Sequence, residues 1–271
     1  MISKYNPQRK RNLFSFFSDK AYKISRSKIE DFIKCPRCFY LDRKCGTKQP
    51  PSFPYTLNNA IDALLKKEFD QYRLKEERHS LLIQHGIDAI PFSHPDLEEW
   101  RDNFKGIKFH HIATNLIISG AMDDIWIKPD GELIVVDFKA TSTTKEITLE
   151  KRDAYKRQLE VYQWLLRQNG FKVSNIGYFL ICNGDSSEAG FTGKLSFDFL
   201  LLPHEGNDFW IEDALVQIKD CLGKNTMPAM SENCDYCKYW EAVKKHMYSH
   251  NLLLENYSRA LPRSIQKLFR L

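Results

Sequence analysis

Two aspartates and a lysine flank a predicted β-turn near the middle of the chain. Asp123 and Asp137 are equally distant in sequence from Asp130, the centre of a Pro-Asp-Gly turn. If residues 116–128 and 132–139 pair as an antiparallel hairpin, the two carboxylates face each other with Cβ atoms about 5 Å apart. Because carboxylates at that distance repel each other unless a cation lies between them, the pattern predicts a metal site.

Lys139 lies two residues after Asp137 and therefore points to the same side of the strand. The rest of residues 133–138 is apolar, which is typical of a strand buried on both faces. Oxygen ligands suit Mg²⁺ or Mn²⁺, and a lysine beside them can orient and help deprotonate an attacking water. The set is the minimum for metal-assisted phosphodiester hydrolysis, with an ion pair at a strand end as the structural alternative. Strand alternation favours Asp123 over Asp124 as the ligand.

Three segments strengthen this hypothesis because of their order along the chain. They are Gly120-Ala121-Met122-Asp123, Asp137-Phe138-Lys139 and the helical pattern Gln158-Leu159-Glu160-Val161-Tyr162. Over residues 24–240 the sequence resembles the PD-(D/E)XK nuclease superfamily, specifically the RecB-like branch that includes CRISPR-associated exonucleases and AddB-type helicase-nuclease subunits. Residues 27–40, with Cys35-Pro36-Arg37, are similar to the segment that opens these proteins.

The resemblance assigns roles to individual residues. Asp123 and Asp137 would be metal ligands, the Phe138 carbonyl would add an oxygen, and Lys139 would position the water. Gln158 and Tyr162 lie one turn apart on one helical face and would approach the active-site edge or the DNA backbone, with plain helix packing as the alternative. Many relatives carry a histidine ligand on an upstream helix. Here that position corresponds to Asp62, with Glu68 as a weaker candidate.

Four of the seven cysteines form two Cys-x-x-Cys pairs, which are Cys35 with Cys38 and Cys234 with Cys237. In a reducing compartment such pairs favour metal binding over disulfides. Cluster-containing relatives have one cysteine upstream and three downstream, whereas this chain has two and two. The resemblance favours a [4Fe-4S] cluster, and a structural Zn²⁺ is equally good chemistry for four thiolates. The alternative is two unrelated buried pairs.

The remaining pattern indicates an α/β fold with a mixed central β-sheet flanked by helices, and the resemblance implies a restriction-endonuclease-like core. Helices are predicted from residue 28 into the first cysteine pair and over 57–72, 153–168 and 208–222. Strands are predicted over 176–182 and 194–202 in addition to the hairpin. The four cysteines would then staple the N-terminal part to the C-terminal part. We expect a basic flexible tail (1–23), a nuclease domain (24–240) and a basic helical extension (241–271).

Charge is distributed unevenly over the 271 residues. Residues 1–48 carry a net charge of +9, residues 238–271 carry +5, and the middle carries −9. Basic ends around an acidic centre suit a polyanion held over a metal site, although solvated tails are an equal explanation. No apolar run is long enough to span a bilayer, and no secretory signal precedes the fold, so we expect a cytoplasmic, intracellular protein with no membrane partner.

The sequence therefore predicts a metal-dependent DNA nuclease that acts on single-stranded DNA or DNA ends. Two other functions stay open. The chain could be a non-catalytic nucleic-acid-binding module, or a subunit that is active only within a helicase or CRISPR assembly. The sequence contains no Gly-x-x-x-x-Gly-Lys phosphate-binding loop, so a helicase motor would be a separate chain.

Overall fold

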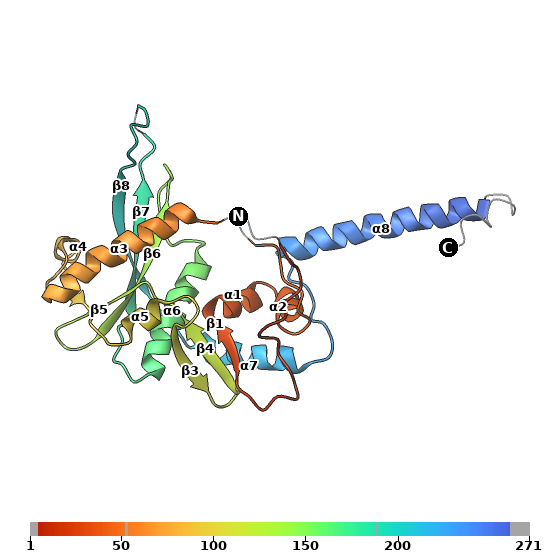
Figure 1. Ribbon diagram of the computed structural model, residues 1–271, viewed down its shortest axis with the longest axis horizontal. Coiled ribbons are helices and arrows are strands. Elements are labelled where there is room, and N and C mark those ends of the chain that lie inside the picture. Colours follow the sequence, from red (N-terminus) through yellow and green to blue (C-terminus); the bar gives the residue numbers. More distant parts are fainter. Residues whose placement is uncertain (1–4, 52–53, 188, 261–271) are drawn as a thin grey trace.

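The computed structural model describes residues 5–51, 54–187 and 189–260, and the side chains of these residues up to 247 (Figure 1). In chain order the elements are β1 (Tyr22–Ser25), α1 (Arg26–Lys34), α2 (Pro36–Arg43), α3 (Thr56–Lys75), α4 (Ser80–Gln84), β2 (Ile90–Pro91), α5 (Leu97–Arg101), β3 (Ile107–His111), β4 (Leu116–Gly120), β5 (Asp124–Ile127), β6 (Leu133–Thr141), α6 (Asp153–Gln168), β7 (Ile176–Gly184), β8 (Phe197–Glu205), α7 (Trp210–Gly223) and α8 (Asp235–Ala260).

The larger sheet has five strands in the order β2-β5-β6-β7-β8. Strand β6 is antiparallel to β5 and parallel to β7, whereas β7 and β8 are antiparallel, so the predicted mixed sheet is confirmed. Strand β6 is the central strand of this sheet, and its apolar, β-branched residues are buried on both faces.

Alternate residues of β6 face two different helices. Leu133 and Val135 belong to the core cluster that contains Leu159 of α6. Ile134 and Val136 belong to the cluster that contains Phe69 of α3. The two helices therefore cover opposite faces of the sheet, and strand parity decides which helix each polar side chain of β5 and β6 meets.

One expectation about the hairpin is wrong. Residues 116–128 were expected to form one strand, but β4 ends at Gly120 and β5 begins at Asp124, and the two strands lie in different sheets. Strand β4 joins β1 and β3 in a second, three-stranded mixed sheet. The chain leaves β4 where the Met122 amide bonds to the Trp100 carbonyl at 3.1 Å instead of to a neighbouring strand.

The predicted register of the hairpin is nevertheless confirmed. Asp124 pairs with Val136, so one further step along the same register brings Asp123 opposite Asp137. Helix α6 has the predicted bounds, and Gly170 follows it with φ +88°, a left-handed conformation that favours glycine after a helix end. The predicted helix leading into the first cysteine pair is divided into α1 and α2, because Cys35 is extended and Pro36 begins a new helix.

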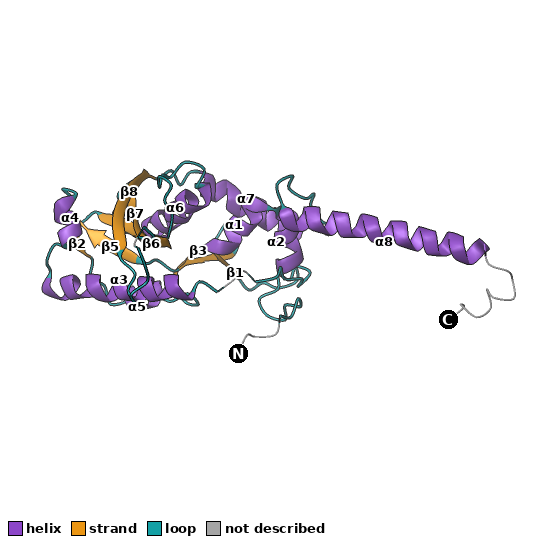
Figure 2. Cartoon of the chain, turned by 90° about the horizontal axis from the view of Figure 1, so that it is seen from above, coloured by secondary structure: helices purple, strands orange, loops and turns teal. Residues whose placement is uncertain are grey.

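The two ends of the chain are arranged differently. The segment before β1 contacts the body through an ion pair of Arg9 with Asp42 at 2.6 Å and through the ring of Phe14, whose centroid lies 5.4 Å from that of Tyr22. Helix α8 projects away from the body (Figures 1 and 2) and runs through residue 240, the expected domain boundary. Residues 261–271 of the expected basic extension lie outside the described residues. No helix in the described part of the chain is long and apolar enough to cross a membrane.

Candidate functional site

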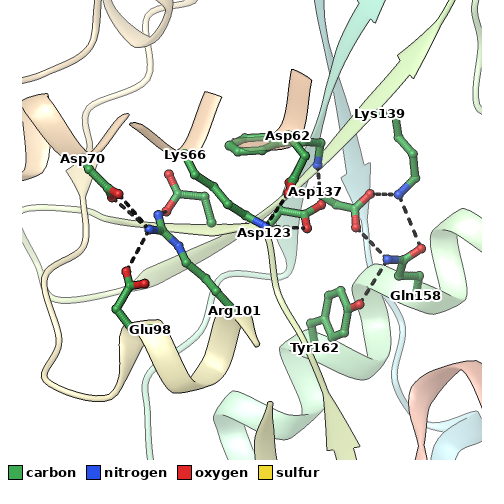
Figure 3. Close-up of polar contacts among 12 residues, drawn as sticks. Asp62, Lys66, Asp70, Glu98, Arg101, Asp123, Asp137, Lys139, Gln158 and Tyr162 are labelled. Atoms are coloured by element: carbon green, nitrogen blue, oxygen red, sulfur yellow. Dashed lines mark hydrogen bonds and ion pairs between the residues drawn. The ribbon is translucent and has the colours of Figure 1, made fainter. Parts of the chain in front are cut away.

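Strand β6 presents Asp137 and Lys139 to helix α6, because both share the parity of Leu133 and Val135. The side chain of Asp137 is fully buried. Its Oδ1 accepts a hydrogen bond of 2.7 Å from Gln158 Nε2, and its Oδ2 forms an ion pair with the Lys139 ammonium (Figure 3). The carboxylate of Asp137 is therefore held by a group from its own strand and a group from α6.

Asp123 lies in the short link between β4 and β5 and points to the same side of the sheet (Figure 3). Its Oδ2 accepts a 2.8 Å hydrogen bond from the backbone N–H of Phe138, which ties the acid to β6. Burial and then the negative charge of Asp137 raise the pKa of Asp123 to about 6, despite the opposing charges of Lys66 and Lys139. Asp123 therefore keeps its proton to a higher pH than an exposed aspartate does.

Helix α3 contributes Asp62 and Lys66, which are four residues apart on one helical face. Lys66 Nζ lies 2.8 Å from Asp62 Oδ2 and 3.6 Å from Asp123 Oδ1 (Figure 3). Burial raises the pKa of Asp62, and the charge of Asp123 adds to this rise. The structure thus places Asp62 beside the hairpin acids. Sequence reasoning missed Lys66, although its i, i+4 spacing from Asp62 was a usable signal.

Lys139 remains a cation in this setting. Burial lowers its pKa, but the charges of Asp137 and Asp123 outweigh burial and raise it overall. Its Nζ lies 3.5 Å from Gln158 Oε1 and 4.9 Å from the ring centroid of Tyr155. An ammonium held in this way can donate to a water or a phosphate oxygen, but it cannot itself accept a proton.

Gln158 links the acids to a buried tyrosine. Its Nε2 donates both to Asp137 and to the hydroxyl of Tyr162, 3.1 Å away (Figure 3). The ring of Tyr162 packs against the end of β4, where a Cβ on Gly120 would lie 2.7 Å from Tyr162 Cε1. A glycine is therefore required at residue 120 for α6 to approach this closely.

Asp124 faces the other side of the sheet. Its side chain is fully buried, and its Oδ1 pairs with the guanidinium groups of Arg73 and Arg101, the latter at 2.9 Å. Arg101 also binds Asp70 at 2.9 Å (Figure 3). These two arginine contacts join α3 and α5 to the start of β5 and were not predicted from the sequence. Asp124 is thus engaged in an ion-pair network that is separate from Asp123.

Two other candidates have different surroundings. The ring of Phe138 lies 5.7 Å from that of Phe69, within the core cluster under α3. The suggested metal-binding role of the Phe138 carbonyl remains a prediction. Glu68 lies on α3, where its Oε1 is 3.0 Å from Nε2 of His79. This contact gives Glu68 a partner outside the group formed by Asp62, Asp123 and Asp137.

The three acids offer hard oxygen donors, which fit Mg²⁺ or Mn²⁺. Among the His, Cys, Asp and Glu side chains of the described part of the chain, one group of three or more is close enough to hold a metal ion as it stands. That group is the four cysteines, whose ligand atoms all lie within 4.8 Å of one another. The ammonium group of Lys66 instead bridges the carboxylates of Asp62 and Asp123, and that of Lys139 pairs with Asp137. These two lysines supply the positive charge that the acids require.

The four cysteines converge from the two ends of the nuclease-like body. Cys35 and Cys38 flank the start of α2, and Cys234 and Cys237 flank the start of α8. Their sulfurs are separated by 3.5 Å for Cys38–Cys234 and Cys38–Cys237, and by 3.7 Å for Cys35–Cys237. Burial raises the pKa of the Cys35 thiol, but hydrogen bonds from the backbone of Ser231 and Cys38 and from the neighbouring thiols outweigh it and lower the pKa to about 6.

This sulfur spacing can be compared with the geometry that each of the two expected occupants requires. Four thiolates at about 2.3 Å from a single zinc ion form a tetrahedron with edges of about 3.8 Å. A cubane cluster places four irons and four sulfides between its thiolates, which must then lie farther apart. The donor set fits a tetrahedral Zn²⁺, and two unrelated cysteine pairs would not bring four sulfurs together.

The fold and the acidic site together define the class of this protein. The family model of the PD-(D/E)XK nuclease superfamily matches residues 23–242, and the chain belongs to that superfamily. Its members are generally metal-dependent nucleases, so nucleic acid is the implied class of substrate. No curated protein matches the sequence. The solved structure of SSO0001 is 15% identical over 76% of this chain and 79% of its own, with a TM-score of 0.32.

Proposed function

We propose that this protein is a metal-dependent deoxyribonuclease that hydrolyses phosphodiester bonds in single-stranded DNA or at DNA ends. One observation carries the proposal. Asp123 and Asp137 are held opposite each other by the Phe138 amide and by Gln158, with the Lys139 ammonium on the same face. An ordinary ion pair at a strand end would need neither the second acid nor the glutamine.

Asp123, Asp137 and Asp62 would hold one or two Mg²⁺ or Mn²⁺ ions, together with the Phe138 carbonyl. A bound ion supplies positive charge to the phosphate and to the attacking water. Gln158 fixes the orientation of Asp137, so that its ligand oxygen does not rotate away. Lys139 donates to and orients the water that attacks phosphorus in line, and the resemblance implies that the 3′ oxygen leaves and a 5′-phosphate remains. Lys66 balances Asp62 and Asp123 until a cation arrives.

For the four-cysteine site we propose a structural Zn²⁺, with the [4Fe-4S] cluster implied by the resemblance as the alternative. Three of the sulfur separations are 3.5–3.7 Å and all four sulfurs lie within 4.8 Å of one another, which supports the single ion. Cys35 and Cys237 are 202 residues apart, so the site closes almost the whole nuclease domain into one loop. Its role is to join the start of α2 to the start of α8.

We also propose that the protein belongs to the RecB-like branch and works beside a helicase or a CRISPR-type partner. Helix α8 supports a protein partner because several large apolar side chains on its first half are exposed. Tyr239 is 72% exposed, and Trp240 and Met247 are more than half exposed. Exposed aromatic residues of this kind are common at protein interfaces.

The test is cleavage of end-labelled single-stranded and duplex DNA in Mn²⁺, Mg²⁺ or EDTA by wild type, Asp137→Ala and Lys139→Ala. Asp88→Ala serves as the matched control because it removes an exposed carboxylate that is paired only with Arg78 on the surface. The proposal expects metal-dependent cutting that both site variants lose and the control retains. If wild type binds DNA but does not cut it, or cuts no better than the variants, the isolated chain is a binding module or requires its partner.

A further inference from the structure

A small polar hollow lies beside Tyr162, which forms part of its lining. It measures about 170 Å³ and is lined by the start of α1, the loop between α5 and β3, and the end of β4. The hydroxyl of Tyr162 faces Gln158 and Asp137, while the tyrosine also lines the hollow. Tyr162 therefore belongs both to this hollow and to the hydrogen-bonded chain that reaches Asp137, so a ligand in the hollow would lie close to the candidate active site.

The lining of the hollow is positively charged. It contains Arg26 and Lys105 and no acidic residue. Arg26 is the first residue of α1, and the first turn of that helix carries no acid. Because a helix N-terminus carries partial positive charge, a basic residue there is unfavourable unless an anion compensates it. Within the described residues, Arg26 has no ion-pair partner that would do so.

Backbone donors face the same place. Ser25 precedes α1 in an extended conformation, and its side chain makes no capping bond to the helix. Its hydroxyl contacts that of Ser27 at 2.9 Å instead. The first N–H groups of α1 are thus left without the side-chain acceptor that normally caps a helix. Such a helix start suits an oxyanion.

Ser119 supplies an independent sign of a ligand. It lies on β4 opposite Ser25 of β1, lines the hollow, and is only 4% exposed. No residue in the described part of the chain forms a hydrogen bond with its hydroxyl. The hydroxyl itself keeps some access to the hollow, and an oxyanion bound there would accept its hydrogen bond.

Two glycines shape the hollow. Gly106 has φ +63°, and a Cβ there would lie 2.4 Å from the Gly120 carbonyl oxygen. A side chain at either glycine would push the loop and the strand apart or displace Tyr162. The two glycines therefore allow the three elements to come together around the hollow. Its volume of about 170 Å³ is enough for a ligand larger than one water molecule.

We propose that this hollow binds a phosphate group of the nucleic-acid strand beside the bond that is cut. The inference rests on the proposed nuclease function and adds to it a residue set that holds the strand: Arg26, Lys105, Ser119 and the start of α1. The phosphate is either the terminal 5′-phosphate of an end or an internal phosphodiester. The chemistry of recognition is the same, because guanidinium, hydroxyl and backbone N–H groups bind phosphate oxygens in both cases.

Binding is measured without cleavage, in EDTA, with a fluorescent 12-nucleotide single strand that carries either a 5′-phosphate or a 5′-hydroxyl. The proteins are wild type, Arg26→Gln, Ser119→Ala, Lys105→Gln and the control Lys75→Gln, which removes an exposed charge at the far end of α3. Arg26→Gln is expected to weaken binding about tenfold and Ser119→Ala several-fold, whereas the control stays within twofold of wild type. Because Lys105 is exposed, Lys105→Gln keeps the test valid even if another variant folds poorly.

The two oligonucleotides identify the occupant. A preference for the 5′-phosphate in wild type that disappears in the variants assigns the hollow to a strand end, and an equal loss for both oligonucleotides assigns it to an internal phosphate. Binding by folded Arg26→Gln, Ser119→Ala and Lys105→Gln within twofold of wild type overturns the proposal. Failure of the proposed nuclease function is a separate result. If wild type binds DNA through the hollow but never cuts it, the nuclease proposal fails and the phosphate site stands.

Discussion

Adjacent aspartates on opposite faces of the sheet should respond to the same substitution in opposite ways. Asp124→Asn removes the charge shared by Arg73 and Arg101, whose side chains are 8% and 6% exposed. The two buried guanidinium groups are then left with Asp70, and Arg101 also keeps the exposed Glu98 at 3.4 Å. Breaking a buried ion pair from one side costs about 3–5 kcal/mol. For a folded domain of about 220 residues, this corresponds to a fall in Tm of about 6–11 °C.

Asp123→Asn should not destabilise the metal-free protein. The asparagine oxygen can still accept the Phe138 N–H. The pKa of Asp123 is raised to about 6 from the model-peptide value of 3.8, so its ionised form opposes folding above about pH 6 and the penalty disappears as the pH falls toward 4. Its side chain is 24% exposed, and solvent screening reduces the penalty to about 1–3 kcal/mol. Asn removes that penalty, so Tm in EDTA at pH 7.5 should be unchanged or raised.

The assay combines thermal unfolding in EDTA with cleavage in Mn²⁺ for wild type and both variants. Asp123→Asn should keep its Tm and lose cleavage, whereas Asp124→Asn should lose Tm and retain cleavage at temperatures where it is folded. The assignment of the two aspartates is refuted if Asp124→Asn melts within 2 °C of wild type, or if it abolishes cleavage while folded and Asp123→Asn does not.

Three further predictions concern cations. Lys66→Ala should lower the Tm of the metal-free protein, because Asp62 and Asp123 then repel each other with no ammonium group between them. Added Mn²⁺ should raise the Tm of this variant more than that of wild type. An equal rise would contradict the role of Lys66. Calorimetric Mn²⁺ affinity should fall about tenfold per pH unit below about 6, because the ion must displace the proton of Asp123, and an unchanged affinity between pH 5 and 7 would count against the site. Elemental analysis of wild type should find one equivalent of zinc, and Cys38→Ser should lose it and lower Tm by roughly 10 °C, since the lost loop closure is worth about 5 kcal/mol. Iron in place of zinc in wild type would show the cluster instead.

Much of the fold follows from short-range pattern. The Pro-Asp-Gly turn sets the register that brings Asp123 opposite Asp137, because strand pairing beside a tight turn is fixed by counting residues. Apolar periodicity and the glycine after it determine the bounds of α6 for the same local reason. The separation of Asp123 from Asp124 also follows from strand alternation alone.

The interruption between β4 and β5 could not be read from the chain. Residues 116–128 are uniformly strand-like, and the break depends on Trp100, which accepts the Met122 amide hydrogen bond from a separate helix. Lys66 contacts Asp123, which is 57 residues further along the chain, and Arg73 contacts Asp124, 51 residues further along. These contacts depend on how helix α3 packs against the sheet, and the local sequence around each residue does not determine that packing.

The sequence by itself determined which side chains can do chemistry: the two acids, the lysine beside them and the four cysteines. Only the tertiary structure decided how those groups are balanced. It placed Lys66 beside Asp62 and Asp123, brought the four sulfurs within 4.8 Å of one another, and put Ser119, Arg26 and Tyr162 around one hollow. The physical reason is that charge balance, burial and ligand spacing depend on distances between segments far apart in the chain, which are fixed only when the sheets and helices pack together.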